Sequence, residues 1–370
     1  MLTKKSADLI SKNSLNVLSK KLNRMSIENL ARDAKAFALP LKMTFRSIDV
    51  RYGLVFAGSG GWAEFAPFTE YSDEISGRWL AGALEQAFGD FPELTRGVIP
   101  VNAIIPAVDE VQAANLTFKA VVEYGMTTLK VKVAQPGQTV SDDLARLTAV
   151  RKQLIDLSVE NVNIRIDVNG LWNVSQAIEL IPQYELAAGG LDYVEQPCAT
   201  LAECAQVKNS ISVKIALDEG LRLAKQVDPA AIRNSADVLI VKSIPQGGVR
   251  NSLEVISAVG LPVVISGSLD TSIGLISGLH LAGSVPDLAG ACGLGTGLLF
   301  AQDLVKTQTL PRNGEITISQ PSPDPDLLEM ANIAVSKEDQ QLWQERMVRA
   351  WYASGSRLVS DNVKQAVEKW

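Results

Sequence analysis

The chain has 370 residues, and 46% of them are apolar, which is enough for one large domain and a smaller one. Its formal net charge is −6, so the chain lacks the excess of basic residues that a nucleic-acid-binding protein needs. No apolar run reaches the length of a membrane span, and the N-terminus lacks the apolar core of a signal peptide. We therefore expect a cytoplasmic protein that binds neither nucleic acid nor membrane. Its oligomeric state, monomer or homo-oligomer, stays open.

The cysteine and histidine content narrows the possible chemistry. Three cysteines, Cys198, Cys204 and Cys292, are an odd number that suits a reducing compartment, and their spacing matches no zinc motif. We expect them to be buried. His280 is the only histidine, and its apolar helical surroundings favour a packing role. Acid–base chemistry would then fall to Lys, Asp, Glu, Tyr or Cys.

The N-terminal part of the chain has a different texture from the rest. Residues 1–32 form a basic extension, and residues 33–97 predict antiparallel strands with a turn at Gly58–Gly61, followed by a helix. This α+β unit is predicted to stand outside the main domain. The C-terminal segment 310–370 is punctuated by prolines and then helical, and we expect it to return to the N-terminal unit.

From residue 98 to 309, short apolar runs rich in Val, Ile and Leu alternate with helical or loop segments, as strands buried on both faces should. One of the helices is predicted over residues 141–157, with Ser141 as its N-cap. Eight such units favour a (β/α)8 barrel. An open doubly wound sheet would require a glycine-rich turn after the first run, and none is present. The predicted strands are 98–105, 127–133, 162–168, 191–197, 213–219, 237–243, 261–267 and, more weakly, 288–295.

Charged residues follow the predicted strands at the end where barrel enzymes carry their active sites. Carboxylates end three successive strands, at Asp167, Glu195 and Asp218. Three hard oxygen ligands at one point would suit Mg2+, with Mn2+ as a second possibility. Taken singly, each residue is more often a helix cap or a solvated charge. Their recurrence, one per strand, is what favours a metal site. Glu219 and Asp192 are expected to have a supporting role or no role in the site.

Lysines flank these carboxylates. Lys130 and Lys132 end the second strand on one face, and Lys242 ends the sixth strand. Burial, a neighbouring cation and a metal would all lower the pKa of Lys132, so that its amine could remove a proton α to a carboxylate. Lys132 and Lys242 are the catalytic candidates, and Lys130 and Asn169 are expected to support them.

Loops rich in glycine and hydroxyl groups follow strands seven and eight. They supply backbone N–H groups that could hold a carboxylate. A phosphate site is less favoured, because no basic residue lies between 251 and 305. We expect substrate contacts from these loops and from the turn in the N-terminal unit, at Ser266, Gly267, Ser268, Gly293, Gly295, Gly58 and Gly60.

The strand-end motifs resemble those of the enolase superfamily, in its muconate-lactonizing subgroup. The matching motifs are Lys-x-Lys at 130–132, Asp-Val-Asn at 167–169, Glu-Gln-Pro at 195–197, Asp-Glu at 218–219 and Lys242. This superfamily is known for a Lys or His base acting with Mg2+. The resemblance implies a (β/α)8 barrel over 98–309 with an N-terminal α+β capping domain over 33–97, completed by the C-terminal tail.

Residues 37–71 and 266–275 are further similar to the actinobacterial o-succinylbenzoate synthase family. That resemblance implies dehydration of 2-succinyl-6-hydroxy-2,4-cyclohexadiene-1-carboxylate through an enediolate stabilised by Mg2+, in menaquinone synthesis. Lys132 would then carry both proton transfers, and Lys242 would stabilise charge from the other face. The same motifs fit an N-acylamino-acid racemase, a dipeptide epimerase or a cycloisomerase. A non-catalytic scaffold barrel is the remote alternative, because the full set of carboxylates and lysines argues against it.

Overall fold

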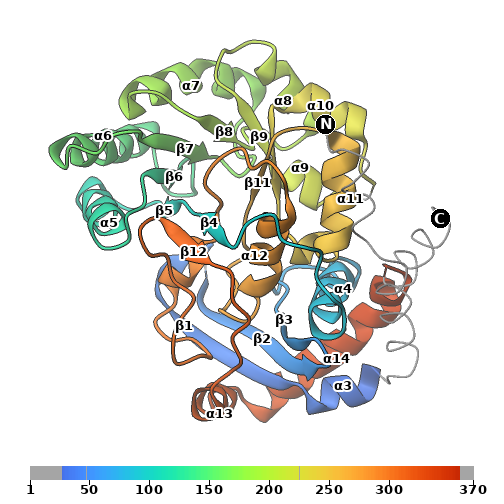
Figure 1. Ribbon diagram of the computed structural model, residues 1–370. Coiled ribbons are helices and arrows are strands. Elements are labelled where there is room, and N and C mark those ends of the chain that lie inside the picture. The colour runs from blue at the N-terminus through green and yellow to red at the C-terminus, as the bar shows by residue number, and fades with distance from the viewer. Residues whose placement is uncertain (1–26, 47, 225, 359–370) are drawn as a thin grey trace.

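The computed structural model describes residues 27–46, 48–224 and 226–358 (Figure 1). Most of the predicted basic extension, at residues 1–26, lies outside the described residues, as does the end of the C-terminal segment, 359–370. The two larger of three hydrophobic clusters organise the described chain. One lies between the sheet and the surrounding helices of a barrel, and the other lies inside an α+β cap.

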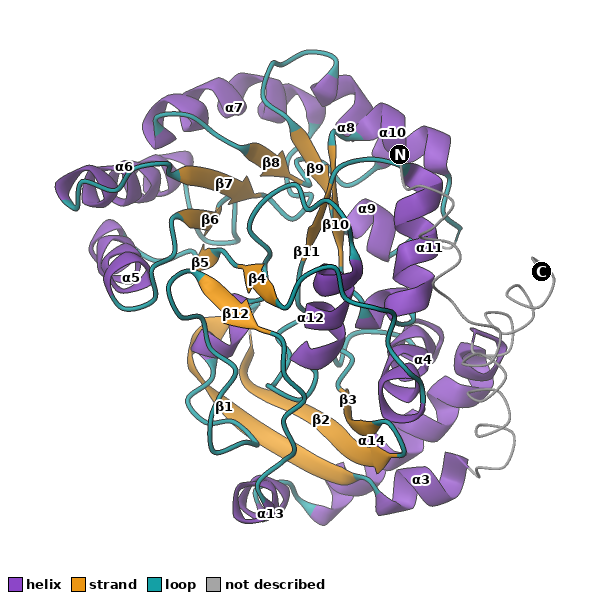
Figure 2. Ribbon diagram, in the orientation of Figure 1, coloured by secondary structure: helices purple, strands orange, loops and turns teal. Residues whose placement is uncertain are grey.

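A parallel sheet of seven strands, in the order β5 to β11, forms the barrel, and helices cover its outer face (Figure 2). The strands are only three to five residues long and carry buried Val, Ile and Leu on the face toward the helices. The strands are β5 (Ala103–Ile105), β6 (Thr128–Lys132), β7 (Asn163–Asp167), β8 (Tyr193–Glu195), β9 (Ile215–Leu217), β10 (Val238–Val241) and β11 (Val263–Ile265).

The helices follow the strands in alternation, which confirms the βα rhythm predicted from the sequence. The N-cap of helix α6 lies two residues earlier than predicted: it is Thr139, not Ser141, because Thr139 and Asp142 form a reciprocal capping box. The helices are α5 (Glu110–Val122), α6 (Val140–Asp156), α7 (Val174–Ala188), α8 (Leu201–Lys208), α9 (Glu219–Arg222), α10 (Pro229–Ser235), α11 (Val249–Val259) and α12 (Leu275–Ser284), with short 3-10 turns η1 (Ile244–Gln246) and η2 (Gly295–Leu299).

The predicted first and eighth strands differ from the structure in detail. The run 98–105 is split into β4 (Val98–Pro100) and β5, because Pro100 has no N–H for a continuous ladder. Strand β4 pairs instead with β12 (Glu315–Thr317). The eighth run makes isolated parallel bridges, Val263 to Leu288, Ser266 to Gly293 and Val101 to Cys292, which close the barrel without a regular strand.

The cap consists of an antiparallel sheet and helices from both ends of the chain (Figure 1). Its N-terminal elements are α3 (Ile27–Asp33), β1 (Lys35–Phe45), β2 (Ile48–Gly58), β3 (Gly61–Phe65) and α4 (Asp73–Phe88). The C-terminal helices α13 (Pro325–Ile333) and α14 (Lys337–Ala350), followed by the π-turn η3 (Trp351–Gly355), pack against β1 and α4. The return of the tail to the cap is thereby confirmed. Helix α3, at the end of the predicted extension, buries Ile27 and Leu30 in the cap core.

Hydrogen bonds fix the cap over the barrel. The carboxylate of Glu85, near the end of α4, accepts from the backbone N–H of Val249 and Arg250 at the start of α11. A carboxylate in that place satisfies free N–H groups and the positive end of the helix dipole. From the same helix, Arg78 donates to the carbonyls of Arg222 and Ala224. The cap is therefore joined to the barrel at the segments that follow β9 and β10.

The cysteines and the histidine lie where packing predicts them. Cys198, Cys204 and Cys292 are free and buried. The ring of His280 stacks on Phe91 with 3.9 Å between centroids, and burial lowers the pKa of His280 to about 4. Within the described part of the chain, no helix is both long and apolar enough to cross a membrane.

Candidate active site

The strand register brings the predicted charges into the barrel interior. Lys132 pairs with Asp167 across β6 and β7, and Asp167 pairs with Glu195 across β7 and β8. Residues opposite one another in a sheet point to the same face, so these three side chains form one inward layer. Lys130 lies two residues below Lys132 on that face, and Asp218 follows the end of β9. Short strands with polar ends thus place five charged side chains at one mouth of the barrel.

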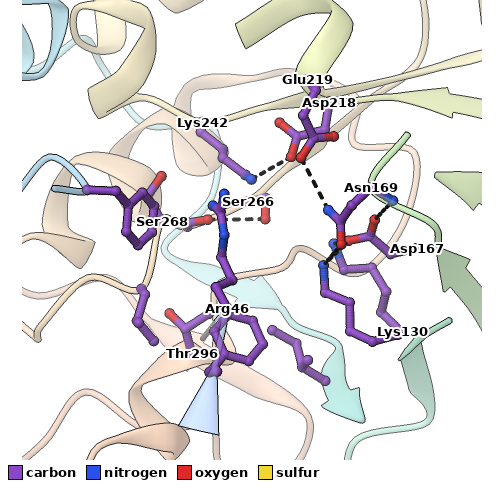
Figure 3. Close-up of a pocket in the computed structure, with 16 residues that line it drawn as sticks. Arg46, Lys130, Asp167, Asn169, Asp218, Glu219, Lys242, Ser266, Ser268 and Thr296 are labelled. Carbon is purple, nitrogen blue, oxygen red and sulfur yellow. Dashed lines mark hydrogen bonds and ion pairs between the residues drawn. The ribbon is translucent and has the colours of Figure 1, made fainter. Parts of the chain in front are cut away.

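A cavity opens at this mouth, between the barrel and the cap (Figure 3). The barrel supplies charged side chains and hydroxyl groups, and the cap supplies two phenylalanines and one arginine. The lining residues are Phe45, Arg46, Phe68, Ile104, Lys130, Lys132, Asp167, Asn169, Asp218, Glu219, Lys242, Ser266, Gly267, Ser268, Leu269 and Thr296.

Lys130 lies among buried carboxylates. Its ammonium is 2.9 Å from both oxygens of Glu195 and 3.4 Å from Asp167. Burial alone would lower the pKa of Lys130, but the two carboxylates outweigh it and raise the pKa. Burial and the nearby Asp167 raise the pKa of Glu195 to about 7, and the ammonium of Lys130 opposes this. Lys130 and Glu195 form an ion pair, because Nζ of Lys130 lies within hydrogen-bond distance of both Oε1 and Oε2 of Glu195.

Lys132 stands between two acceptors. Its Nζ donates to Asp167 Oδ2 at 2.6 Å and to Asn169 Oδ1 at 2.7 Å. Asn169 in turn donates to Glu219 at 3.2 Å, which fixes its amide orientation. The backbone of Asn169 is left-handed, with φ of 54°, a conformation that Asn adopts more readily than most residues. Burial would raise the pKa of Asp167, but Lys132 and Lys130 hold it well below its usual range.

Lys242 approaches from the other side of the cavity (Figure 3). Its Nζ donates to Asp218 Oδ2 at 2.6 Å, and Arg222 contacts the other oxygen at 3.2 Å. These cations outweigh burial and keep the pKa of Asp218 well below its usual range. Arg222 also donates to the phenol of Tyr71 in the cap. This half of the site is therefore tied directly to the capping domain.

The donor set suits a hard divalent cation. Asp167, Glu195 and Asp218 lie on adjacent strands, and each is at most 2% exposed. The low pKa values of Asp167 and Asp218 keep these oxygens charged, as Mg2+ requires. In the described residues these carboxylates contact lysine ammonium groups, and no three acidic, Cys or His side chains converge closely enough to form a ready-made cation cage. A bound ion would therefore share the carboxylates with the lysines.

The loop after β11 is held by the cap. Arg51 from β2, only 2% exposed, donates to the carbonyls of Leu269 and Ser268. Glu64 from β3 accepts from the backbone N–H and hydroxyl of Thr271. Burial and the nearby Asp270 raise the pKa of Glu64 to about 7. The sheet of the cap thus positions the hydroxyl-rich loop that lines the cavity.

The structure brings most of the predicted site residues together. Lys130, Lys132, Asp167, Asn169, Asp218, Lys242, Ser266, Gly267 and Ser268 line the cavity, and Glu195 lies buried beneath it, bonded to Lys130. Gly293 and Gly295 lie outside the lining: Gly293 bonds to Gly267 in the barrel wall, and Gly295 packs against the carbonyl of Asn102.

The structure does not bring Gly58 and Gly60 to the cavity. Their turn packs on the end of α4, where a Cβ at Gly58 would lie 2.2 Å from the carbonyl of Ala87. The cap segments that do line the cavity are the end of β1, with Phe45 and Arg46, and Phe68. Of these three cap residues, only Arg46 could have been suspected from the sequence, because it is a charged residue between two apolar predicted strands. Glu219 also lines the cavity, in the supporting position considered for it.

The chain matches models of two domains found together in one superfamily. Residues 36–87 match the enolase N-terminal domain-like family, and residues 112–323 match the enolase C-terminal domain-like family. The structure is similar to that of muconate lactonizing enzyme from Pseudomonas fluorescens complexed with muconolactone, with a TM-score of 0.67 and 17% identity, covering 81% of this chain and 97% of that one. The L-Ala-D/L-Glu epimerase from Bacillus subtilis gives a TM-score of 0.64 at 18% identity, covering 78% and 96%. These likenesses establish the fold.

Sequence relatives are much closer. The o-succinylbenzoate synthase of Thermobifida fusca is 41% identical over 321 residues, which cover 85% of this chain and 95% of the relative. The o-succinylbenzoate synthase of Mycobacterium ulcerans is 38% identical, covering 88% and 95%. This chain belongs to the o-succinylbenzoate synthase family of the enolase superfamily.

Proposed function

We propose that the chain catalyses the metal-dependent dehydration of 2-succinyl-6-hydroxy-2,4-cyclohexadiene-1-carboxylate to o-succinylbenzoate, a carbon–oxygen lyase reaction of menaquinone synthesis. The observation that carries this proposal is the cavity lined by both Lys132 and Lys242, each of which is paired with a buried carboxylate, Asp167 and Asp218 respectively. Its support is family membership at 37–41% identity over more than nine-tenths of each relative.

The proposed base is Lys132. The reaction removes the proton on the carbon that carries the ring carboxylate and the hydroxyl on the neighbouring carbon, and it releases water. Lys132 would take that proton and return it to the departing hydroxyl, so that one amine completes both transfers. Asp167 and Asn169, both bonded to its Nζ, would keep the amine aimed into the cavity.

The proposed metal ligands are Asp167, Glu195 and Asp218. Enzymes of the superfamily use a divalent metal, generally Mg2+, and Mn2+ offers similar chemistry. When bound, such an ion supplies positive charge that stabilises the substrate carboxylate as its α-proton leaves. Lys130, paired with Glu195, would keep that carboxylate ionised and correctly placed.

The proposed role of Lys242 is electrostatic. Its ammonium is held at 2.6 Å from Asp218, across the cavity from Asp167 and Asn169, the partners of Lys132, and a cation there would stabilise charge spread over the ring (Figure 3). Ser266, Gly267 and Ser268 would contribute polar contacts to the substrate from the loop that the cap holds in place. Together these groups would bind a small carboxylate substrate between barrel and cap.

A second candidate function is racemisation of an N-acylamino acid at the same site. The specific observation in its favour is the pair of lysines from β6 and β10 lining one cavity, since a racemase needs a base on each face of the substrate.

We also propose a cytoplasmic location, supported by three cysteines that are free and buried.

Turnover of both substrate classes tests the function. Full-length protein with Mg2+ should convert the cyclohexadiene carboxylate to o-succinylbenzoate, followed by absorbance and by chromatography of the product. N-succinylamino acids, followed by polarimetry, should react more slowly or not at all. Exhaustive chelation should remove activity, and Mg2+ should restore it. Racemisation without dehydration would replace the proposal by the second candidate, and full activity in chelator would contradict the metal assignment.

A further inference from the structure

Arg46 is a cation at the mouth of the cavity with no carboxylate to balance it. Four cationic side chains line the cavity, and Lys130, Lys132 and Lys242 each contact a carboxylate within 3 Å. Among the described residues, Arg46 contacts only an aromatic ring: its guanidinium lies 4.4 Å from the centroid of Phe68. Arg46 thus brings an available positive charge to a site whose other charges are already paired.

The position of Arg46 is fixed by the cap. It lies between β1 and β2, with a left-handed φ of 52°, and its side chain runs from the cap across the cavity toward Ser266 (Figure 3). Phe45 and Phe68 stand beside it in the lining, and Arg46 itself remains exposed to solvent. An ion pair formed beside such apolar walls is stronger than one formed in open solvent.

Thr296 offers a second, independent sign of a polar ligand. It is 4% exposed, it lines the same cavity from η2, and its hydroxyl is buried without a hydrogen-bond partner in the described residues. A Cβ at Gly267 would lie 3.4 Å from that hydroxyl, which places Thr296 beside the loop after β11. A buried hydroxyl without a partner is unfavourable unless a ligand or water supplies one.

We propose that Arg46 and Thr296 form an anion subsite for the distal carboxylate of a dicarboxylate substrate. This inference rests on the proposed function, because the substrate then carries one carboxylate on its ring and another at the end of its succinyl chain. The ring carboxylate would lie at the lysine and carboxylate layer, and the succinyl chain would reach toward the cap. Arg46 would supply a charge-assisted hydrogen bond, and Thr296 would donate a neutral one.

Binding of two matched ligands tests the subsite. One is o-succinylbenzoate, and the other is 2-butanoylbenzoate, which keeps the ring carboxylate and ketone but ends in a methyl group. Calorimetric titration of the full chain with Mg2+ should show o-succinylbenzoate binding at least tenfold tighter. Arg46→Met should weaken o-succinylbenzoate binding about 10- to 100-fold, and Thr296→Val about 3- to 10-fold. Neither should change the affinity for 2-butanoylbenzoate by more than about twofold.

The matched control is Lys119→Met, which removes one exposed positive charge from α5, outside the cavity. It should leave both affinities unchanged. The subsite is overturned if Arg46→Met weakens both ligands equally, or if Thr296→Val leaves o-succinylbenzoate binding intact. Failure of the proposed function is a separate result: a wild-type protein that does not dehydrate the cyclohexadiene carboxylate, yet discriminates the two ligands through Arg46, keeps the dicarboxylate subsite and loses the reaction.

Discussion

Replacing Lys130 by Met should destabilise the protein strongly in chelator and much less in Mg2+. Lys130 is 6% exposed, lies 2.9 Å from both oxygens of Glu195 and is 3.4 Å from Asp167. Met fills a similar volume without the charge, so the substitution leaves two buried carboxylates side by side. At 2.9 Å and an effective dielectric constant of 20, the attraction lost between Lys130 and Glu195 is about 6 kcal/mol. Measured losses on breaking a buried pair are about 3–5 kcal/mol.

The assay is equilibrium unfolding in urea, followed by circular dichroism, with excess chelator and with saturating Mg2+. We expect Lys130→Met to lose about 3–5 kcal/mol in chelator. The loss should be at least about 1.5 kcal/mol smaller in Mg2+, because a bound cation supplies charge to the same carboxylates. The control Lys119→Met should stay within about 0.5 kcal/mol of wild type in both conditions. A loss below about 1 kcal/mol in chelator, or equal losses in both conditions, would refute the reasoning.

Three further predictions concern the metal ligands and the contact between cap and barrel. Asp167→Asn should weaken Mg2+ binding at least tenfold in calorimetry while the circular dichroism spectrum stays unchanged; unchanged affinity would remove Asp167 from the ligand set. The pKa of Glu64 is raised to about 7, so the folded protein holds this proton more tightly than the unfolded chain does. The stability gained from that proton is complete below the ordinary carboxyl pKa and is lost as pH rises through 7. Glu64→Gln should therefore melt close to wild type near pH 5 and a few degrees higher near pH 8.5, and a pH-independent difference would contradict this. Gly248→Ala should cost about 2–3 kcal/mol in urea unfolding, because φ is 112° and a Cβ would lie 2.0 Å from Glu85; a neutral effect would contradict the packing.

The barrel and its charged mouth follow from local patterns. Each strand is a short buried run, and the residue that ends it is fixed by its place in the chain. Parallel register then brings Lys132, Asp167 and Glu195 into one layer without further information. That is why the metal and lysine candidates could be predicted from the sequence.

The rest depends on contacts between distant segments. Strand β4 pairs with β12, more than 200 residues away, and no local pattern announces this. Gly58 and Gly60 have the composition of a binding turn, yet they pack on α4, because the hairpin between β1 and β2 is the part of the cap that reaches the cavity. Arg46 enters the site only through that docking of cap on barrel.

The central claim, that Lys132 is the base of this site, is tested most directly by solvent exchange. In deuterium oxide with Mg2+, the product is quantified at partial conversion, and the remaining substrate is recovered so that deuterium at its α-position can be measured by mass spectrometry. Lys132→Ala should abolish both dehydration and α-proton exchange. Lys242→Ala should slow dehydration about 10²–10³-fold, as loss of one electrostatic donor does, with the base still present. Near wild-type dehydration by Lys132→Ala, with Lys242→Ala inactive in both exchange and dehydration, would contradict the account and reverse the two roles.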